Sequence, residues 1–330
     1  MTDLSKQDRA TLPADNESMR PPYPGSDVWA SRRCAGGLQL FDRQSGLNLL
    51  LDEVPLPCSQ WALAPRYVSI ALTNACDLRC PYCYAPKRSA RLQTSVLQSW
   101  LLELAAHECI GIGFGGGEPT LHPDFAALCK FVARETPMAV TFTTHSHRID
   151  PAMVAELSGA VHFVRVSVDG VGQTYESSRG RPFQAILRQL EVIRNFAPFG
   201  INVVVNSTTV RELDRVAEVA TSAGARELLL LPQRGTASVP SVDNDTLGLM
   251  GEWISRYRGS VPLTLSESAA TVFAGNAPVP GEVGLRSYSH VDASGVLRSS
   301  SFDKKGVPIS NDGIVEAFRT LQAIHAGIDE

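Results

Sequence analysis

Three cysteines stand close together in Asn74–Tyr84, which reads N-A-C-D-L-R-C-P-Y-C-Y. Cys76, Cys80 and Cys83 have the spacing Cys-x3-Cys-x2-Cys, and thiolates are the usual protein ligands of iron–sulfur clusters. Three such ligands hold three corners of a cubane and leave one iron open to an exogenous ligand. A structural zinc ion normally takes four protein ligands, and no Cys or His stands nearby at a suitable spacing. The pattern predicts one [4Fe–4S] cluster; three unrelated thiols, or a zinc site completed by a distant residue, are the alternatives.

Two further segments combine glycine with side chains that bind ligands. Gly115–Thr120 reads G-G-G-E-P-T and follows a predicted strand. Glycine lets the backbone approach a ligand closely, and the Glu118 carboxylate suits an ammonium group. Ser167–Gly170 reads S-V-D-G at the end of another predicted strand, and Arg179-Gly180 follows. Each segment alone is a weak signal, because a glycine run is often only a turn.

Taken together, these segments resemble the radical S-adenosylmethionine (SAM) superfamily over residues 66–233. The Ser-Val-Asp-Gly and Arg-Gly segments are similar to those of the SPASM/twitch group, which modifies peptides and proteins. The resemblance implies a [4Fe–4S] cluster on Cys76, Cys80 and Cys83, with SAM bound to the open iron through its methionine. It also implies that an electron from the cluster cleaves SAM to a 5′-deoxyadenosyl radical, which abstracts a substrate hydrogen. The electron would come from a reductant such as ferredoxin or flavodoxin.

The resemblance also implies which residues contact SAM. Tyr82 would stack near the adenine, Glu118 would bind the methionyl amino group, Ser167 the ribose and Arg179 the carboxylate, while Asp169 would shape the turn. Those relatives often read Thr-Asn-Gly where this chain has Thr-His-Ser, so His145 is expected to face SAM or substrate. We do not expect His145 and His147 to bind a metal ion together. The expected contacts are Tyr82, Gly116, Gly117, Glu118, Thr144, His145, Ser167, Arg179 and Asn206.

The remaining cysteines need their own interpretation. The chain has seven cysteines, an odd number, and three of them are clustered. This pattern argues against a disulfide framework and indicates a reducing compartment. Cys109 and Cys129 lie among apolar neighbours, which favours packing. Cys34 and Cys58 precede the main domain, and either is a candidate hydrogen-atom donor to a substrate radical.

An alternation of strands and helices must position these residues. The strands are expected at Tyr67–Leu72, Cys109–Phe114, Met138–Thr143, Val161–Val168, Ile201–Asn206 and Glu227–Leu231. The helices are expected at Leu92–His107, Pro123–Arg134, Pro151–Leu157, Phe183–Phe196, Glu212–Ala223 and Asp245–Tyr257. Six β–α units predict a parallel sheet, and the absence of Gly-x-Gly-x-x-Gly after the first strand argues against a dinucleotide fold. We therefore expect an α/β fold, a partial (β/α)6 TIM-like barrel, with function at the carboxyl ends of its strands.

Polar residues on two of these strands suggest an enclosed lumen. Arg165, Ser167 and Asp169 alternate with valines, and Asn202 and Asn206 share one face of the next strand. Strand alternation sends such a polar set to one side of the sheet. A ligand cavity is one interpretation, and polar groups that satisfy one another are the other.

The expected domains are a disordered tail at 1–25, an N-terminal extension at 26–65, the core at 66–260 and a C-terminal cap at 261–330. The extension should hold a β-hairpin over Leu38–Asp52, and the cap a hairpin over Ser289–Ser299 and a helix over Asp312–Ala326. The cap resembles a SPASM/twitch region, but no cysteine follows Cys129. We therefore expect it to be cluster-free.

Charge and hydropathy limit the classes of partner that the chain is expected to bind. The net charge of −4 does not suggest nucleic acid, and no apolar run reaches the roughly 18 residues of a membrane span. The polar N-terminus lacks the core of a signal peptide, so a cytoplasmic protein is expected. The leading hypothesis is a radical SAM enzyme that crosslinks or epimerises a ribosomally made peptide. The alternatives are redox-neutral chemistry on a small molecule such as a sugar or nucleoside, and a non-catalytic metal-binding regulatory protein.

Overall fold

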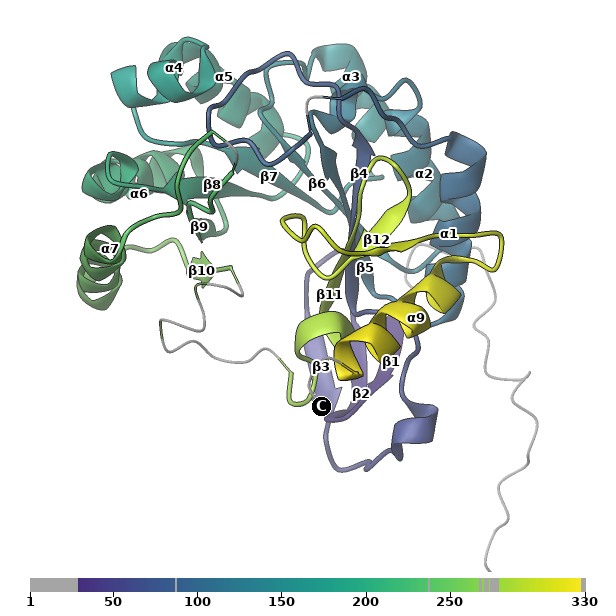
Figure 1. Cartoon of the computed structure of the whole chain (residues 1–330). Helices are drawn as coiled ribbons and strands as arrows, with labels where there is room; N and C mark the ends of the chain where they lie inside the picture. The colour runs from purple at the N-terminus through teal and green to yellow at the C-terminus, as the bar shows by residue number, and fades with distance from the viewer. Residues whose placement is uncertain are drawn as a thin grey trace, which may run out of the picture.

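The computed structural model describes residues 29–327 except 87, 237, 267–268, 270–272 and 274–278. Its main sheet has the strand order β10-β9-β8-β7-β6-β5-β4-β11-β12-β13. From β4 to β10 every neighbouring pair is parallel, and helices cover one face of the arc of strands (Figure 1). The expected partial barrel is thus confirmed. The parallel strands are β4 (Tyr67–Thr73), β5 (Gly111–Gly116), β6 (Ala139–Thr144), β7 (Phe163–Ser167), β8 (Phe199–Val205), β9 (Leu228–Pro232) and β10 (Leu263–Leu265).

The two faces of the strands differ in polarity, as alternation requires. In β7, Val164 and Val166 have no exposed surface and pack in the hydrophobic core. Arg165 and Ser167 alternate with them and are only half-buried. Ser167 is in register with Asn202 of β8, so these two polar residues lie side by side on the inner face. The polar face therefore belongs to the lumen and the valines to the helix-covered side.

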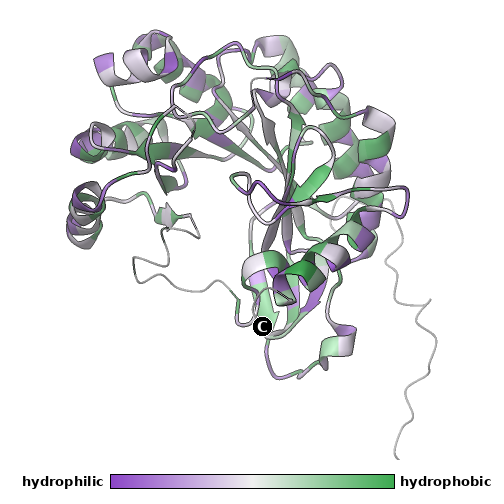
Figure 2. Cartoon of the chain, in the orientation of Figure 1, coloured by the Kyte–Doolittle hydropathy of each residue, from purple (hydrophilic) through white to green (hydrophobic). Residues whose placement is uncertain are grey.

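The helices that cover the sheet carry both hydrophobic and hydrophilic residues (Figure 2). Their apolar stripes pack toward the sheet, as amphipathic helices of globular proteins do. One short helix, α4, was not expected from the sequence; it follows β7 and ends at Arg179. The helices are α1 (Thr94–Ala106), α2 (Phe125–Glu135), α3 (Pro151–Leu157), α4 (Gln173–Arg179), α5 (Phe183–Arg194), α6 (Leu213–Ala223), α7 (Asn244–Arg256) and α9 (Ile314–Ala326).

A separate three-stranded sheet precedes the barrel. It contains the expected hairpin, β2 (Gly37–Phe41) and β3 (Asn48–Leu51), and a further strand, β1 (Ala30–Cys34), which pairs antiparallel with β2. Arg32 of β1 is 1% exposed and pairs with Glu282 at 2.9 Å. Its Nη1 also donates to the carbonyl of Ala64. This buried cation fastens the small sheet to the start of the barrel.

The C-terminal segment closes the other side of β4. β11 (Tyr288–Val291) pairs parallel with β4, and the expected hairpin continues through β12 (Val296–Arg298) to β13 (Val307–Pro308). Thus β10 and β11, both in the range expected for a cap, are strands of the main sheet. The expected tail at 1–25 lies outside the described residues. Within the described part of the chain, no helix has the length and apolarity that crossing a membrane demands.

Candidate active site

The three clustered cysteines lie in the loop after β4, at the carboxyl edge of the sheet. Cys76, Cys80 and Cys83 are each partly buried. Burial raises the pKa of Cys76 to about 11, and it raises the pKa of Cys80 as well. Because burial disfavours a thiolate, a bound metal ion would favour the deprotonated form of these thiols.

The glycine–glutamate loop after β5 is bound to this cysteine loop through its backbone. The N–H of Gly117 donates to the carbonyl of Thr73 at 2.7 Å, and the N–H of Glu118 donates to that of Ala75 at 2.8 Å. Gly116 has a φ of +122°, and a methyl group on Gly117 would lie 2.2 Å from the Ala75 oxygen. The glycines are therefore required by the close approach of the two loops, whatever ligand they meet.

Glu118 is a buried carboxylate held by several donors. It is 1% exposed. Its Oε1 accepts hydrogen bonds from the hydroxyls of Thr120 and Thr144 at 2.7 and 2.8 Å, while its Oε2 accepts from the backbone N–H of His145 at 3.0 Å. Oε1 thus accepts from two hydroxyl groups, whereas Oε2 accepts from one backbone N–H and lies 3.3 Å from the His145 Nε2. Oε2 therefore has fewer hydrogen-bond donors than Oε1 and is the oxygen better placed to accept a further one.

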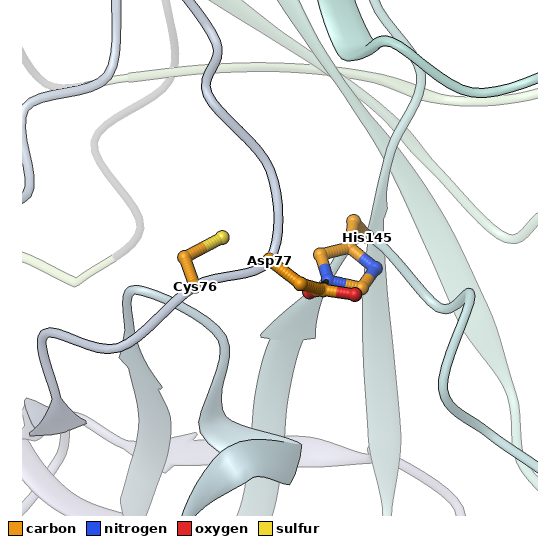
Figure 3. Close-up of side chains that lie close together, drawn as sticks. All are labelled: Cys76, Asp77 and His145. Atoms are coloured by element: carbon orange, nitrogen blue, oxygen red, sulfur yellow. Dashed lines mark hydrogen bonds and ion pairs between the residues drawn. The ribbon is translucent and has the colours of Figure 1, made fainter.

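His145 and Asp77 form a second polar pair beside the cysteines. The His145 Nε2 lies 2.8 Å from the Asp77 carboxylate, and Figure 3 shows this contact next to Cys76. Arg181 also donates to Asp77, at 3.1 Å. The pKa of Asp77 is lowered: although partial burial raises it, the His145 and Arg181 charges outweigh burial. Asp77, which the sequence did not single out, therefore belongs to the site.

His147 turns away from this pair. Its Nε2 lies 2.8 Å from the hydroxyl of Tyr175, and its ring stacks on that of His145 with centroids 5.5 Å apart. Burial and the neighbouring His145 lower the pKa of His147 to about 4. The Nε2 atoms of the two histidines thus face different partners, Asp77 for His145 and Tyr175 for His147.

A third group joins the cysteine loop to β7 and β8. Asp169 has no exposed surface, accepts from the hydroxyl of Tyr82 at 2.6 Å and forms an ion pair with Arg179. Its other oxygen accepts from the N–H of Val204 at 2.7 Å. Arg179 in turn lies 3.6 Å from the Cys80 sulfur. Asp169 does more than shape the turn after β7, because it holds residues of three different segments together.

The other predicted site residues are placed less uniformly. Ser167 is half-buried at the end of β7, on the inner face. Asn206 uses its side chain locally: its oxygen accepts from the N–H groups of Thr208 and Thr209, and its amide nitrogen donates to Gln233. Since these partners occupy its amide, the structure gives no support for Asn206 as a SAM contact.

The two candidate hydrogen donors both belong to the N-terminal region. Cys34 has no exposed surface, and its thiol donates to the carbonyl of Gly37 within the small sheet. Burial raises its pKa. A thiol without exposed surface does not meet a substrate, so this placement argues against Cys34. Cys58 is exposed, in the short 3-10 helix Cys58–Gln60, so access does not argue against it.

The arrangement of donors fits a cluster better than a single ion. Zinc–thiolate bonds of about 2.3 Å would bring ligand sulfurs within roughly 3.8 Å of one another. Among residues with described positions, the one trio whose ligand atoms lie within 4.8 Å of one another is Cys76, Asp77 and His145. Asp77 and His145 of this trio are hydrogen-bonded to each other, and Cys80 and Cys83 do not belong to it. The sulfurs of Cys76, Cys80 and Cys83 are therefore too far apart to bind one ion together. Ligands of a multi-atom cluster are expected to be spaced in this way.

Known proteins resemble this chain in its central part. Residues 70–221 match the sequence model of the radical SAM superfamily. The mycofactocin maturase MftC of Mycolicibacterium smegmatis is 34% identical over 170 residues, which cover 49% of this chain and 43% of that protein. The AdoMet-dependent heme synthase of Methanosarcina barkeri is 29% identical over 171 residues, 49% of each chain. This chain thus spans about half the length of these curated relatives.

Solved structures agree at the level of the fold. The crystal structure of Streptococcus suis SuiB bound to the precursor peptide SuiA superposes with a TM-score of 0.71 at 12% identity, over 89% of this chain and 87% of that one. The architecture, the matched model and the three cysteines at the end of β4 agree with one another. Residues 70–221 therefore match a radical SAM domain, and the cofactors of that superfamily are a [4Fe–4S] cluster and SAM.

Proposed function

We propose that this protein is a radical SAM enzyme in which Cys76, Cys80 and Cys83 hold one [4Fe–4S] cluster. The observation that supports this most is the convergence, at the carboxyl ends of β4 and β5, of three partly buried thiols with the buried carboxylate of Glu118. When bound, the cluster and SAM supply the abstraction of a hydrogen atom from the substrate. Ferredoxin or flavodoxin is the proposed source of the electron.

The chain's own residues would bind and orient SAM. Glu118 Oε2 is the proposed acceptor for the methionyl ammonium, since two threonine hydroxyls occupy Oε1. Ser167 on the inner face is the proposed ribose contact. Arg179 is the proposed carboxylate contact, because its guanidinium reaches the cysteine loop from α4. Thr144 and His145 position Glu118, to which both donate.

We propose a ribosomally made peptide as the substrate, with crosslinking or epimerisation as the outcome. The support is the segment Ser167–Gly170 with Arg179-Gly180, similar to that of peptide-modifying radical SAM enzymes, together with the likeness to MftC. The likeness to a heme synthase favours a second candidate, a small-molecule substrate. The described part of residues 261–330 contains no cysteine, so we place no auxiliary cluster there.

The test is anaerobic reconstitution followed by counting iron and assaying 5′-deoxyadenosine from SAM under dithionite. About four irons per chain and the loss of 5′-deoxyadenosine in Cys76→Ala, Cys80→Ala and Cys83→Ala are expected. Cys129→Ala, which alters a buried thiol of α2, is the control and should retain both. A tightly held zinc without SAM cleavage would contradict the proposal and support the regulatory role. Bound peptide or bound metabolite in the isolated protein would then separate the two substrate classes.

A further inference from the structure

Arg179 lies beside one of the three cysteine sulfurs. It is the last residue of α4, and its Nη1 is 3.6 Å from Cys80 Sγ. Its side chain is 12% exposed, so water competes little for this contact. Hydrogen bonds to the sulfurs and local charge are among the main determinants of iron–sulfur reduction potentials.

Asp169 and Tyr82 hold the guanidinium of Arg179 in position. Asp169 forms an ion pair with Arg179 and is itself held by the N–H of Val204 in β8 and by the hydroxyl of Tyr82. The guanidinium carbon also lies 5.9 Å from the centroid of the Tyr82 ring. A continuous series of contacts thus runs from the backbone of β8 to the Cys80 sulfur.

The sign of the effect follows from charge. Reduction adds one negative charge to the cluster, and a cationic donor at a ligand sulfur stabilises the more negative form. In a partly desolvated site such a contact is stronger than in water. Asp169 opposes part of this charge, but it pairs with Nη2 of the guanidinium, whereas Nη1 is the nitrogen that faces the Cys80 sulfur.

We propose that Arg179 sets the reduction potential of the cluster by donating a hydrogen bond to the Cys80 sulfur, with Asp169 and Tyr82 as positioning residues. This inference rests on the proposed function, because it requires the cluster at Cys76, Cys80 and Cys83. It adds to that function a role for Arg179 that exists before SAM binds.

The experiment is a potentiometric titration of the reconstituted, SAM-free protein, followed by the EPR signal of the reduced cluster. At a fixed poise, Arg179→Met should lower the ratio of reduced to oxidised cluster about tenfold, which is about 59 mV for a one-electron couple. Arg179→Lys keeps the charge and should give a smaller decrease. Tyr82→Phe should change the ratio in wild type but not in the Arg179→Met background, since a residue acting through Arg179 is not additive with it.

Arg181→Met is the matched control. It removes the same charge two residues away, from a side chain that is 40% exposed and pairs with Asp77. A change below about threefold is expected, because exposed charges are screened. Equal changes in Arg181→Met and Arg179→Met, or no change in Arg179→Met with about four irons bound, would overturn the inference. If Arg179→Met binds no iron, the Arg179→Lys and Tyr82→Phe titrations decide. Wild-type protein that assembles no cluster would instead refute the proposed function.

Discussion

The backbone N–H of Gly117 donates to the carbonyl oxygen of Thr73 at 2.7 Å, so the loop after β5 is fastened to the end of β4 just before the cysteines. The close approach of the two loops, and not the hydrogen bond itself, makes the glycine a structural requirement. A side chain on Gly117 would meet the backbone of Ala75 at 2.2 Å, and backbone does not yield easily.

Gly117→Ala should therefore displace the two loops from each other. We expect a loss of about 3 kcal/mol in the free energy of unfolding and a lower iron content after reconstitution. Urea denaturation and iron analysis check this. Gly115→Ala is the matched control, because a methyl group there meets nothing within 4 Å. Equal losses in both variants would show that the close approach is not the cause.

Glu118→Gln tests the proposed ammonium contact. The amide keeps the shape of the side chain but loses its charge. Its NH2 group would also face a hydrogen-bond donor, either the Thr120 hydroxyl or the His145 N–H, from which Glu118 accepts in the wild type. We expect SAM affinity to fall at least tenfold, roughly the value of one charge-assisted hydrogen bond, as measured by calorimetry on the reconstituted protein. The control is Glu156→Gln, which alters an exposed residue paired with Lys130. Unchanged affinity in Glu118→Gln would remove Glu118 from the proposed binding site.

Acid should destabilise the fold through buried histidines. His290 is 3% exposed, and burial together with Arg298 lowers its pKa to about 4. Its unfolded-state pKa is about 6.5, so the unfolded chain binds more protons between these values and stability falls as pH drops from 6.5 to 4. His290 alone would contribute about 3 kcal/mol to this decrease. His147 and His162, with pKa values also lowered by burial to about 4, add to it.

His290→Gln should flatten the stability profile over that range. Urea denaturation at intervals of pH measures the slope, and His325→Gln, at an exposed position of α9, is the control. A slope that His290→Gln leaves unchanged would mean that other groups account for the acid sensitivity.

Glu103 of α1 caps the start of α9. Its two oxygens accept from the N–H groups of Ile314 and Val315 at 2.9 and 3.1 Å, and a carboxylate at a helix N-terminus also complements the helix dipole. Glu103→Gln should reduce stability by about 1 kcal/mol, as judged by urea denaturation. Glu316→Gln, in an exposed pair with Arg319 on the same helix, should cost less than about 0.5 kcal/mol. The reverse order would contradict the capping role.

Local pattern was enough to predict the barrel and the N-terminal hairpin. The alternation of apolar runs and amphipathic segments indicates the hydrophobic period and the length of each strand and helix. Both are properties of short stretches of chain. The predictions were less complete where tertiary contacts decide. α4 is only seven residues long, and the parallel pairing of β11 with β4 joins distant segments, so neither leaves a local signal.

The candidate site divides in the same way. The cysteine and glycine motifs and the Ser-Val-Asp-Gly segment carry fixed spacings, and the sequence therefore suggested Cys76, Glu118 and Arg179. The partners of these residues did not follow from spacing: Asp77 and Asp169 acquire their roles from side chains that only the fold brings near. Asn206 shows the converse, since its inward-facing register predicted a ligand contact while its amide is used by the loop that follows.

The pairing of β11 with β4 has a consequence for how the molecule is made. Ser69 of β4 and His290 of β11, in contact across these strands, are 221 residues apart. During synthesis at about 5–20 residues per second, the strand that leads into the cysteine loop emerges early and remains an open edge for tens of seconds. Such edges are prone to wrong pairing. In the nascent chain, the cysteine loop therefore follows a strand whose pairing with β11 has not yet formed. We expect the cluster to be inserted after β11 has been synthesised and has paired with β4.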